Sequence, residues 1–449
     1  MAAGNIEDRW LSKRKHPKTG RRERTARYGQ GKRYRVKQIP GVKDRSFESL
    51  EDAKAWLKRS TTDVERGEFY DPRAGNITLQ DYVEKTWWPT LRMAPTTKAS
   101  MKYRIFGHIL PLAGHLRLSQ LGSDEIRLWL AQVEKRIDVN TVIVTWRHFS
   151  SIMQAAHKAK KIAANPFRDP DLKPPAPPKS KAQAWPIPTV LAVRSGLDPR
   201  YQVLLDLAVG AGLRQGEAFG FSPDDVDGEV LRVTRQIVKV GGKLAFAPPK
   251  GDKEREAPCP AELALAIKGH VGEFGSVEVT LPWVDPARPN LEWSARPTRS
   301  VRLLVTTPRS GGAAGGALNR STFDEYQWKP ALAGAGVIPE VVKEVVQKPG
   351  KKAWTRKTWA MPREDGFHVL RHTFASVVLA EGETITKLAH WLGHSDPAFT
   401  LRTYVHFMPR AGRRGIEALG AMLSSLRLLD APAEPTSGSD SPDTPQAAG

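Results

Sequence analysis

The sequence predicts a multidomain, mainly α-helical protein with small β-sheets. At 449 residues the chain is longer than one ordinary domain, so two or three domains are expected. Apolar residues recur at helical spacing through 78–165 and again through 366–408. Strand-like alternation occurs only in short segments beside glycine turns, which limits the predicted sheets to a few strands.

Residues 1–72 are predicted to form a small basic domain of the ββ(β)α type. Positions 1–60 contain 18 Lys and Arg against 7 Asp and Glu, so they hold +11 of the chain's formal charge of +21. A concentrated excess of cations favours a polyanion as the partner. For 13–27 alone, a solubilising or disordered tail explains the charge equally well.

The second half of this basic domain contains the pattern of a strand followed by a helix. Segment 32–39 alternates with period two, and Pro40-Gly41 is a turn signal. Ser49 is predicted to cap a helix that continues through Leu57. One face of the predicted strand is cationic and supplies candidate contacts to such a polyanion: Arg33, Arg35 and Lys37, with Ile39 beside them.

Residues 73–168 are predicted to be a helical domain. Ser123 is a candidate cap for one helix, and a long helix is expected from Val139 to Ile162, with Asn165-Pro166 after it. Residues 169–184 follow as a linker, because five prolines fall within 169–180 and stiffen the chain.

Residues 185–428 form the largest predicted domain. A hairpin is expected over 236–247, with its turn at Gly241-Gly242. Residues 429–449 contain no basic residue and many Pro, Ser, Thr and Asp, so this tail is predicted to be disordered. Three segments of the domain combine residue types that can do chemistry: Gly212-Leu213-Arg214-Gln215-Gly216-Glu217, His368-Val369-Leu370-Arg371-His372, and Leu392-Gly393-His394 with Thr403-Tyr404 after it.

Each segment taken alone also has a purely structural interpretation. Arg214 and Glu217 have the spacing of a helical ion pair, and Tyr404 has the character of a core aromatic. The histidine pairs 368/372 and 390/394 have helical metal-ligand spacing, but neither contains the intervening Glu of a zinc protease, so no metal site is predicted. Gly393 fits a helix C-terminus, and Ser395 is a candidate cap for the helix that would carry Tyr404.

Together and in this order, the three segments resemble the tyrosine recombinase family, which includes phage integrases. The resemblance is strong over 185–425 and implies a tyrosine-recombinase-like catalytic domain. By the same resemblance, residues 73–168 would be a core-binding domain and residues 1–72 an arm-binding domain.

The resemblance also implies catalytic roles for five residues. Tyr404 would be the nucleophile. Arg214 and Arg371 would clamp the scissile phosphate, and His368 and His394 would complete its pocket.

Two further roles follow from the resemblance. Glu217 would orient the first arginine. The family's lysine on a β-hairpin best matches Lys250, although Gly251 stands where a threonine is common, and Lys243 and Lys253 lie nearby. The segment between the hairpin and the second motif looks longer than is usual in the family.

The implied function is site-specific cleavage and rejoining of double-stranded DNA through a 3′-phosphotyrosine, for integration of phage or mobile-element DNA into a bacterial chromosome. A homotetramer on the attachment sites is implied, with a host DNA-bending protein and an excisionase as possible partners. The alternatives are a tyrosine transposase, a resolution recombinase, or a non-catalytic DNA-binding protein of the same fold.

No cofactor is expected for this function. The covalent phosphotyrosine conserves the energy of the broken bond, and no Gly-x-x-x-x-Gly-Lys-Ser/Thr phosphate loop is found. The sequence has no apolar stretch of about 18 residues and a single cysteine, Cys259, so a cytoplasmic protein of a bacterial host is expected.

Overall fold

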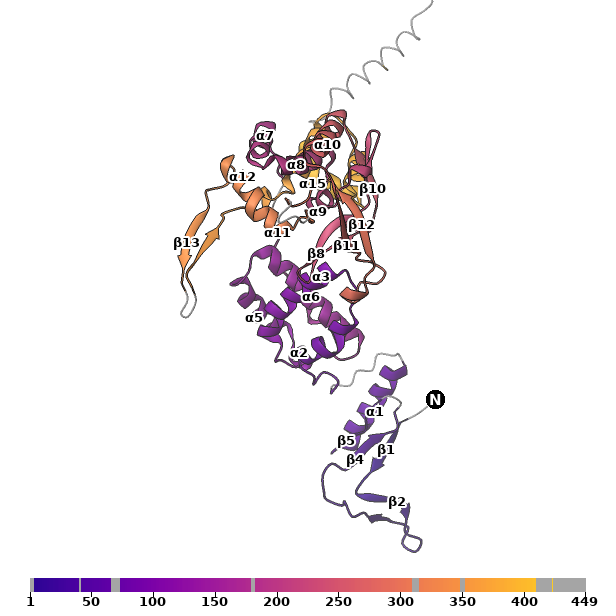
Figure 1. Cartoon of the computed structure of the whole chain (residues 1–449). Helices are drawn as coiled ribbons and strands as arrows, with labels where there is room; N and C mark the ends of the chain where they lie inside the picture. The colour runs from indigo at the N-terminus through magenta and orange to yellow at the C-terminus, as the bar shows by residue number, and fades with distance from the viewer. Residues whose placement is uncertain are drawn as a thin grey trace, which may run out of the picture. The chain divides into compact units, whose positions relative to one another are not determined.

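The computed structural model describes residues 4–39, 42–65, 73–178, 182–308, 315–347, 352–408 and 422. The chain divides into two compact units (Figure 1). The first contains residues 1–180, 238–247 and 281–299, and the second contains residues 181–237, 248–280 and 300–449. The predicted turn at Pro40-Gly41 and the predicted disordered tail 429–449 lie outside the described residues.

The N-terminal part of the first unit is a small sheet covered by one helix. The helix packs on a core of Val36, Ile39 and Ala53. Ser49 accepts a hydrogen bond from the Glu51 amide at 3.1 Å, which confirms it as the cap. The sheet has the antiparallel order β1-β4-β5 and these elements: β1 (Asn5–Asp8), β4 (Tyr34–Lys37), β5 (Arg45–Phe47) and the helix α1 (Leu50–Glu65).

The structure corrects the predicted strand 32–39 in one respect. Gln38 has φ of 64°, so the strand ends at Lys37 and the period-two alternation stops there. The alternation had placed Ile39 on the same face as Arg33 and Arg35. In the structure Ile39 is instead buried in the core.

A two-stranded ribbon that sequence reasoning did not resolve lies between β1 and β4 in the chain. It pairs β2 (Leu11–Lys15) with β3 (Arg22–Arg24). Its side chains are largely exposed and mostly basic. The sequence 13–27 thus contains an ordered ribbon, and the disordered-tail interpretation of these residues is wrong.

Residues 73–178 of the first unit are predominantly helical, with a separate apolar core that includes Trp129, Trp146 and Phe149. Asp138 caps the long helix α6, which ends at Lys158, four residues before the predicted end. Ser123 is the first helical residue of α5, and its hydroxyl donates to Asp169 at 2.5 Å, so its predicted role as the cap is wrong. The main helices are α2 (Leu79–Tyr82), α3 (Pro95–Arg104), α4 (Leu110–Ala113), α5 (Ser123–Glu134) and α6 (Val139–Lys158). No helix in the described ranges is long and apolar enough to cross a membrane.

The second unit combines helices with a three-stranded sheet of order β10-β7-β6. The strands of this sheet are β6 (Val226–Asp227), β7 (Val230–Val233) and β10 (Arg255–Pro258). The predicted hairpin 236–247 is confirmed as β8 (Gln236–Val240) and β9 (Lys243–Ala247), a separate pair whose residues 238–247 belong to the first unit. The helices of the second unit are α7 (Ile187–Gly196), α8 (Pro199–Ala211), α9 (Gln215–Phe219), α10 (Ala261–Phe274), α11 (Arg320–Phe323), α12 (Lys329–Gly334), α13 (Val369–Ala380), α14 (Ile385–Leu392) and α15 (Pro397–Tyr404).

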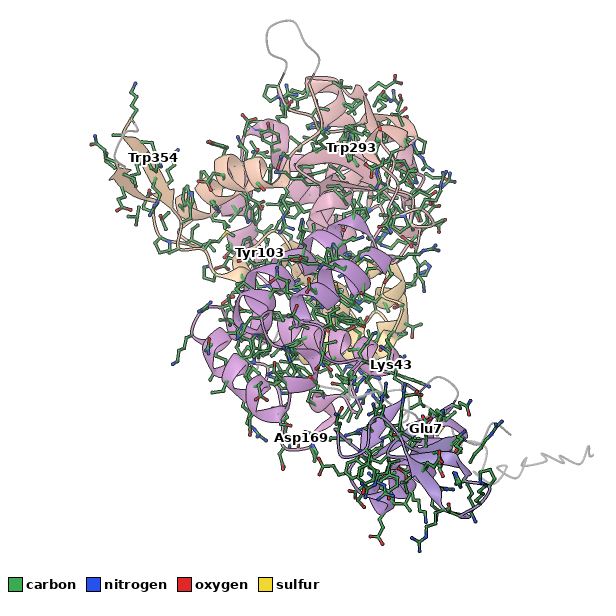
Figure 2. All side chains as sticks on the ribbon, turned by 90° about the horizontal axis from the view of Figure 1, so that it is seen from below. Glu7, Lys43, Tyr103, Asp169, Trp293 and Trp354 are labelled. Carbon is green, nitrogen blue, oxygen red and sulfur yellow. The ribbon has the colours of Figure 1, made fainter. Side chains whose placement is uncertain are left out.

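The long segment between the hairpin and the second motif contains two further strand pairs. β11 (Val277–Pro282) pairs with β12 (Thr298–Leu303), and β13 (Val342–Val346) pairs with β14 (Trp354–Thr358). The β13–β14 ribbon projects from the helical body beside α12, and Trp354 lies on it (Figures 1 and 2). The predicted fold class, mainly helical with small sheets, is confirmed.

Candidate active site

The candidate site is built around the C-terminal end of α14. Gly393 follows this helix with φ of 63°, a left-handed conformation that suits glycine. A Cβ at this position would lie 2.8 Å from Cδ of Arg255, so the packing also excludes a side chain. Because the last carbonyls of a helix have no partner within it and carry negative partial charge, this end attracts cations.

Three arginines bind the last carbonyls of α14. Leu392 O accepts from Nη2 of Arg214 at 3.2 Å and also from Nη2 of Arg371. Trp391 O accepts from Nε of Arg255 at 2.7 Å. One helix end therefore gathers side chains that are far apart in the sequence.

Glu217 supplies the negative charge that compensates the arginines. Its carboxylate accepts two hydrogen bonds from Arg255, at 2.9 and 2.6 Å, and one from Nη1 of Arg214 at 2.9 Å. Burial by itself would raise the pKa of Glu217, but hydrogen bonding and charge from Arg255, with the charges of Arg214 and Arg371, lower that pKa to about 2. Glu217 is therefore ionised at neutral pH and holds Arg214 in place.

Arg371 is almost completely buried, with 1% of its surface exposed. Nη1 donates to Gly212 O at 2.6 Å, while Nε has no partner among the described residues. Burial, and then the charges of Arg214 and Arg255, lower the pKa of Arg371 to about 9. This value is still above 7, so the guanidinium stays charged at neutral pH. A buried, unpartnered N–H is a donor that an anion can satisfy.

His394 has both ring nitrogens engaged. Nε2 lies 3.3 Å from Nη2 of Arg371, and Nδ1 lies 2.8 Å from Oγ1 of Thr400. Because an arginine can only donate, Nε2 must be the acceptor and Nδ1 carries the proton. Burial, with the charges of Arg371, Arg214 and Arg255, lowers the pKa of His394 to about 3, so the ring is neutral.

Tyr404 is the last residue of α15 and is buried, with 1% of its surface exposed. Its hydroxyl lies 2.9 Å from Nδ1 of His372, while the ring of His394 stacks at 6.5 Å. Burial raises the pKa of Tyr404, and the charges of Arg371 and Arg214 act in the opposite direction. The cap of α15 is Asp396, whose Oδ1 accepts from the Ala398 amide at 2.9 Å, so the prediction of Ser395 as the cap is wrong.

His368 stands at the N-terminal end of α13, with its ring 4.8 Å from that of His372. Burial, followed by the charges of His372 and Arg371, lowers the pKa of His368 to about 3. The structure therefore brings Arg214, Glu217, His368, Arg371, His394 and Tyr404 into one cluster.

The remaining predicted site residues lie outside this cluster. Lys250 is exposed in the turn after β9, and no hydrogen bond or ion pair joins it to the cluster within the described part of the chain. In the N-terminal domain, all three predicted DNA contacts form ion pairs with nearby carboxylates: Arg33 with Asp8 at 2.9 Å, Arg35 with Asp44 at 2.8 Å, and Lys37 with Glu7 at 3.1 Å.

Sequence reasoning missed two members of the cluster. Arg255 pairs with Glu217 across 38 residues, and no local pattern marks that contact. His372 belongs to the second motif, but the sequence analysis gave it no role. Only the structure shows that its Nδ1 contacts the tyrosine hydroxyl. In the described ranges, no group of three or more His, Cys, Asp and Glu side chains is arranged to hold a metal ion.

No family model matches the chain. A relative named prophage phiRv2 integrase, from Mycobacterium tuberculosis (strain ATCC 25618 / H37Rv), is 24% identical over 396 residues, covering 86% of this chain and 89% of the relative. A tyrosine recombinase XerC-like protein of Caldanaerobacter subterraneus is 25% identical over 225 residues, covering 49% of each.

Two solved structures share the fold. The Tn1549 transposon integrase, in complex with transposon right end DNA, aligns with a TM-score of 0.56 and 16% identity over 78% of this chain and 100% of that chain. A lambda integrase tetramer bound to a Holliday junction aligns with a TM-score of 0.50 and 12% identity over 85% and 93%. The fold is thus that of the integrases. In sequence, the chain is similar to proteins named as a prophage integrase and as tyrosine recombinases.

Proposed function

We propose that this protein is a site-specific DNA recombinase that cleaves and rejoins strands through a 3′-phosphotyrosine at Tyr404. Its biological task in this proposal is the integration of phage or mobile-element DNA into a bacterial chromosome. One observation supports it above the others: the Tyr404 hydroxyl lies in one buried cluster with Arg214, Arg371 and three neutral histidines.

The arginines stabilise the phosphate during the reaction. In the transition state five oxygens surround phosphorus and negative charge increases on the non-bridging oxygens. Planar guanidinium groups bind two oxygens in fixed geometry, which suits them to this charge. Arg214 is held by Glu217 and Leu392 O, and Arg371 by Gly212 O and Leu392 O, so neither must be ordered during catalysis.

The nucleophile must lose a proton when it attacks. An ordinary tyrosine has a pKa near 10, so ionising it at pH 7 costs about 4 kcal/mol. The positive charges of Arg371 and Arg214 lower this cost, and loss of the proton to a neighbouring base avoids a free phenolate. The resulting phosphotyrosine retains the energy of the broken phosphodiester, and a free 5′ hydroxyl reverses the step without ATP.

The departing 5′ oxygen needs a proton from a general acid. We assign this role to Lys250, by the resemblance to the family's hairpin lysine. Lys250 is exposed, and the turn that carries it includes Gly251 with φ of 86° and Asp252 with φ of 57°. Lys253 directly follows this turn and is the alternative donor.

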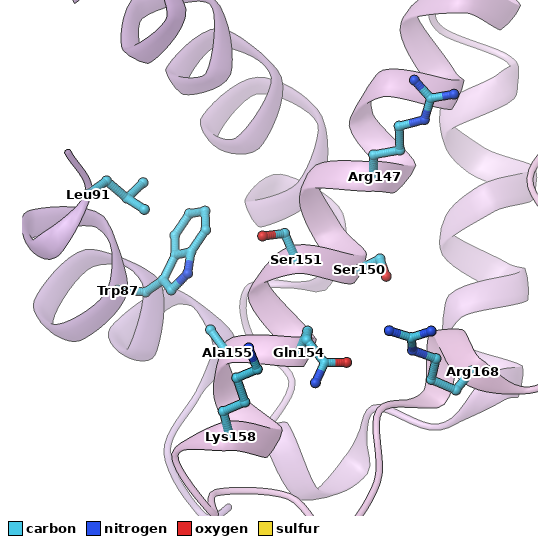
Figure 3. A pocket seen from close by; sticks show the side chains of 9 residues that line it. All are labelled: Trp87, Leu91, Arg147, Ser150, Ser151, Gln154, Ala155, Lys158 and Arg168. Atoms are coloured by element: carbon cyan, nitrogen blue, oxygen red, sulfur yellow. The ribbon is translucent and has the colours of Figure 1, made fainter. Parts of the chain in front are cut away.

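A groove on the helical body of the first unit is a candidate surface for the core site. It encloses about 420 Å³ and is drawn in Figure 3. Arg147, Ser151, Gln154 and Lys158 recur along one face of α6, and Arg168 faces the groove from the segment after it. Within the described residues, no ion pair neutralises the three cations of the groove, Arg147, Lys158 and Arg168. They would contact phosphates, while the Gln154 amide could recognise a base edge.

This groove assignment has a direct test. Arg147→Ala and Lys158→Ala should each weaken binding to all duplexes similarly, and each should reduce the slope of log affinity against log salt by about 1. Gln154→Ala should instead reduce the preference for the core sequence. If all three variants bind core DNA like the wild-type protein, the groove does not contact it.

The N-terminal domain would bind arm sites that differ from the crossover core. Arg33, Arg35 and Lys37 would supply contacts by exchanging their carboxylate partners for phosphates, and the exposed β2–β3 ribbon adds further cations. Deleting residues 1–70 should remove arm-site protection and integration but spare cleavage of a nicked core site. Full integration by the truncated protein would refute this division of labour.

We also propose that four protomers act on two duplexes, as in the solved lambda integrase tetramer bound to a Holliday junction. A host DNA-bending protein and an excisionase are proposed partners. A transposase role is the nearest alternative, and a Tn1549 transposon integrase shares the fold. Transfer between plasmids bearing attachment sites, scored for target sequence, separates integration at one site from transposition into many.

The decisive experiment is covalent trapping. A core duplex with a nick near the cleavage site releases a short fragment after attack, so the enzyme–DNA adduct accumulates. Wild-type protein should form this adduct, and Tyr404→Phe, which removes one oxygen, should bind the same DNA and form none. An adduct with the Phe variant, or none with either protein, would refute the assignment.

A further inference from the structure

The hydrogen bond between Tyr404 and His372 carries an inference that rests on the proposed function and extends it. We propose that His372 is the catalytic base that takes the tyrosine proton during strand cleavage and returns it during rejoining. Nδ1 of His372 lies in direct hydrogen-bond contact with the Tyr404 hydroxyl, at 2.9 Å.

The direction of this hydrogen bond follows from burial. Tyr404 is 1% exposed, and no other hydrogen-bond partner of its hydroxyl occurs among the described residues. A buried hydroxyl that does not donate is costly, so its proton points to the available acceptor, Nδ1 of His372. His372 then carries its own proton on Nε2, and its Nδ1 lone pair is already aligned with the proton to be removed.

The other two histidines of the cluster do not have this geometry. His394 is fixed as an acceptor from Arg371 and as a donor to Thr400, which leaves no free lone pair. His368 packs its ring on that of His372 and makes no hydrogen bond to Tyr404 within the described ranges. His372 is therefore the base in direct contact with the reacting oxygen.

Several charged or titratable groups face His372. Arg371 and His368 come from its own helix, Tyr404 from α15, and His406 from the turn after α15. Burial, then the charges of Arg371 and His406, lower the pKa of His372 to about 4. Near pH 7 nearly every molecule thus has the lone pair available, and the half-buried ring can pass the proton to solvent afterwards.

During cleavage, the Tyr404 oxygen forms a bond to phosphorus as its proton moves to Nδ1 of His372. The bond from phosphorus to the 5′ oxygen breaks, and that oxygen takes a proton from the general acid, for which Lys250 is proposed. In rejoining, the 5′ hydroxyl attacks phosphorus, gives its proton back to the lysine, and Tyr404 recovers its proton from His372.

The test separates proton transfer from positioning. In His372→Asn the amide oxygen can take the place of Nδ1 and accept the same hydrogen bond, but it cannot hold a proton. His390→Asn makes the same chemical change at an exposed position of α14 and is the matched control. Single-turnover adduct formation on nicked core DNA is measured between pH 6 and 8 for full-length proteins, and core-site affinity is measured in parallel.

We expect the adduct-formation rates of the wild-type protein and of His390→Asn to vary little between pH 6 and 8, because His372 stays neutral over this range. His372→Asn should be about 100-fold slower or worse at pH 7, the usual contribution of a general base. Its rate should rise about tenfold per pH unit, because only pre-ionised tyrosine can then attack. Core-site affinity should match that of the wild-type protein.

Three outcomes would overturn the proposal. A His372→Asn enzyme with wild-type rate and pH profile would make His372 a positioning residue. A faster variant would mean that the hydrogen bond restrains Tyr404. If the variant is unstable, His372→Ala with added imidazole is the second arm, and a failure of imidazole to restore cleavage counts against the proposal. Absence of any wild-type adduct would instead refute the proposed function itself.

Discussion

Removing the charge of Glu217 is the sharpest test of how the active site is held together. Glu217→Gln keeps the shape of the side chain but leaves Arg214 and Arg255 without their shared counter-charge. Folding lowers the pKa of Glu217 from 4.5 to about 2. At about 1.4 kcal/mol per pKa unit, this corresponds to about 3 kcal/mol of stability at pH 7. Breaking a buried ion pair typically costs about 3–5 kcal/mol, which agrees.

Scanning calorimetry of the full chain measures this effect. For a unit of this size, about 3 kcal/mol corresponds to a melting temperature lower by about 6–12 °C. The carboxylate's pKa is depressed by folding, so its contribution is present above the unfolded pKa of 4.5 and is lost as pH falls through about 2. The gap between wild-type and variant proteins should therefore be full at pH 7 and should narrow below about pH 4.5.

Asp224→Asn is the matched control for this variant. It makes the same chemical change in the exposed ion pair with Arg302, where solvent screens the charges, so the melting temperature should barely move. The reasoning would be refuted if Glu217→Gln and Asp224→Asn lowered the melting temperature equally. It would also be refuted if the difference in melting temperature between the wild-type protein and Glu217→Gln did not narrow in acid. Cleavage by Glu217→Gln should also fall, because Arg214 loses the partner that orients it.

Three further predictions concern the same site. Gly393→Ala should lower the melting temperature more than Gly228→Ala, because both have positive φ but only the first Cβ meets another side chain, that of Arg255, at 2.8 Å; equal losses would mean that only backbone strain matters. Arg371→Lys should keep core-site binding but lose most of the cleavage rate, since an ammonium lacks the planar fork, and wild-type speed would make this arginine purely structural. Lys250→Ala should cleave slowly on normal DNA and recover on DNA whose 5′ leaving oxygen is replaced by sulfur, which needs no proton. Rescue of Lys253→Ala in its place would move the general acid to that lysine.

The sequence by itself was sufficient for the fold class and for most of the residues that cluster in the candidate site. Local patterns explain this success: the 236–247 hairpin follows from its Gly-Gly turn and alternation, and the Gly393 helix end from the glycine after an apolar helix. The three motifs, by their order along the chain, predicted the residues that the structure gathers around Tyr404. Where two local signals competed, prediction failed, as for Ser395 beside Asp396 and for the strand that stops at Gln38.

Only the tertiary structure decided which partner each of these side chains meets. Arg255 reaches Glu217 and Trp391 O because β10 and α14 pack together, and no spacing in the sequence encodes a contact across 136 residues. The same holds for His372, whose neighbours along α13 are known from the helix period, while its contact with Tyr404 depends on where α15 lies. The physical reason is that a hydrogen bond requires atoms within about 3 Å, and such precision between distant segments comes from packing.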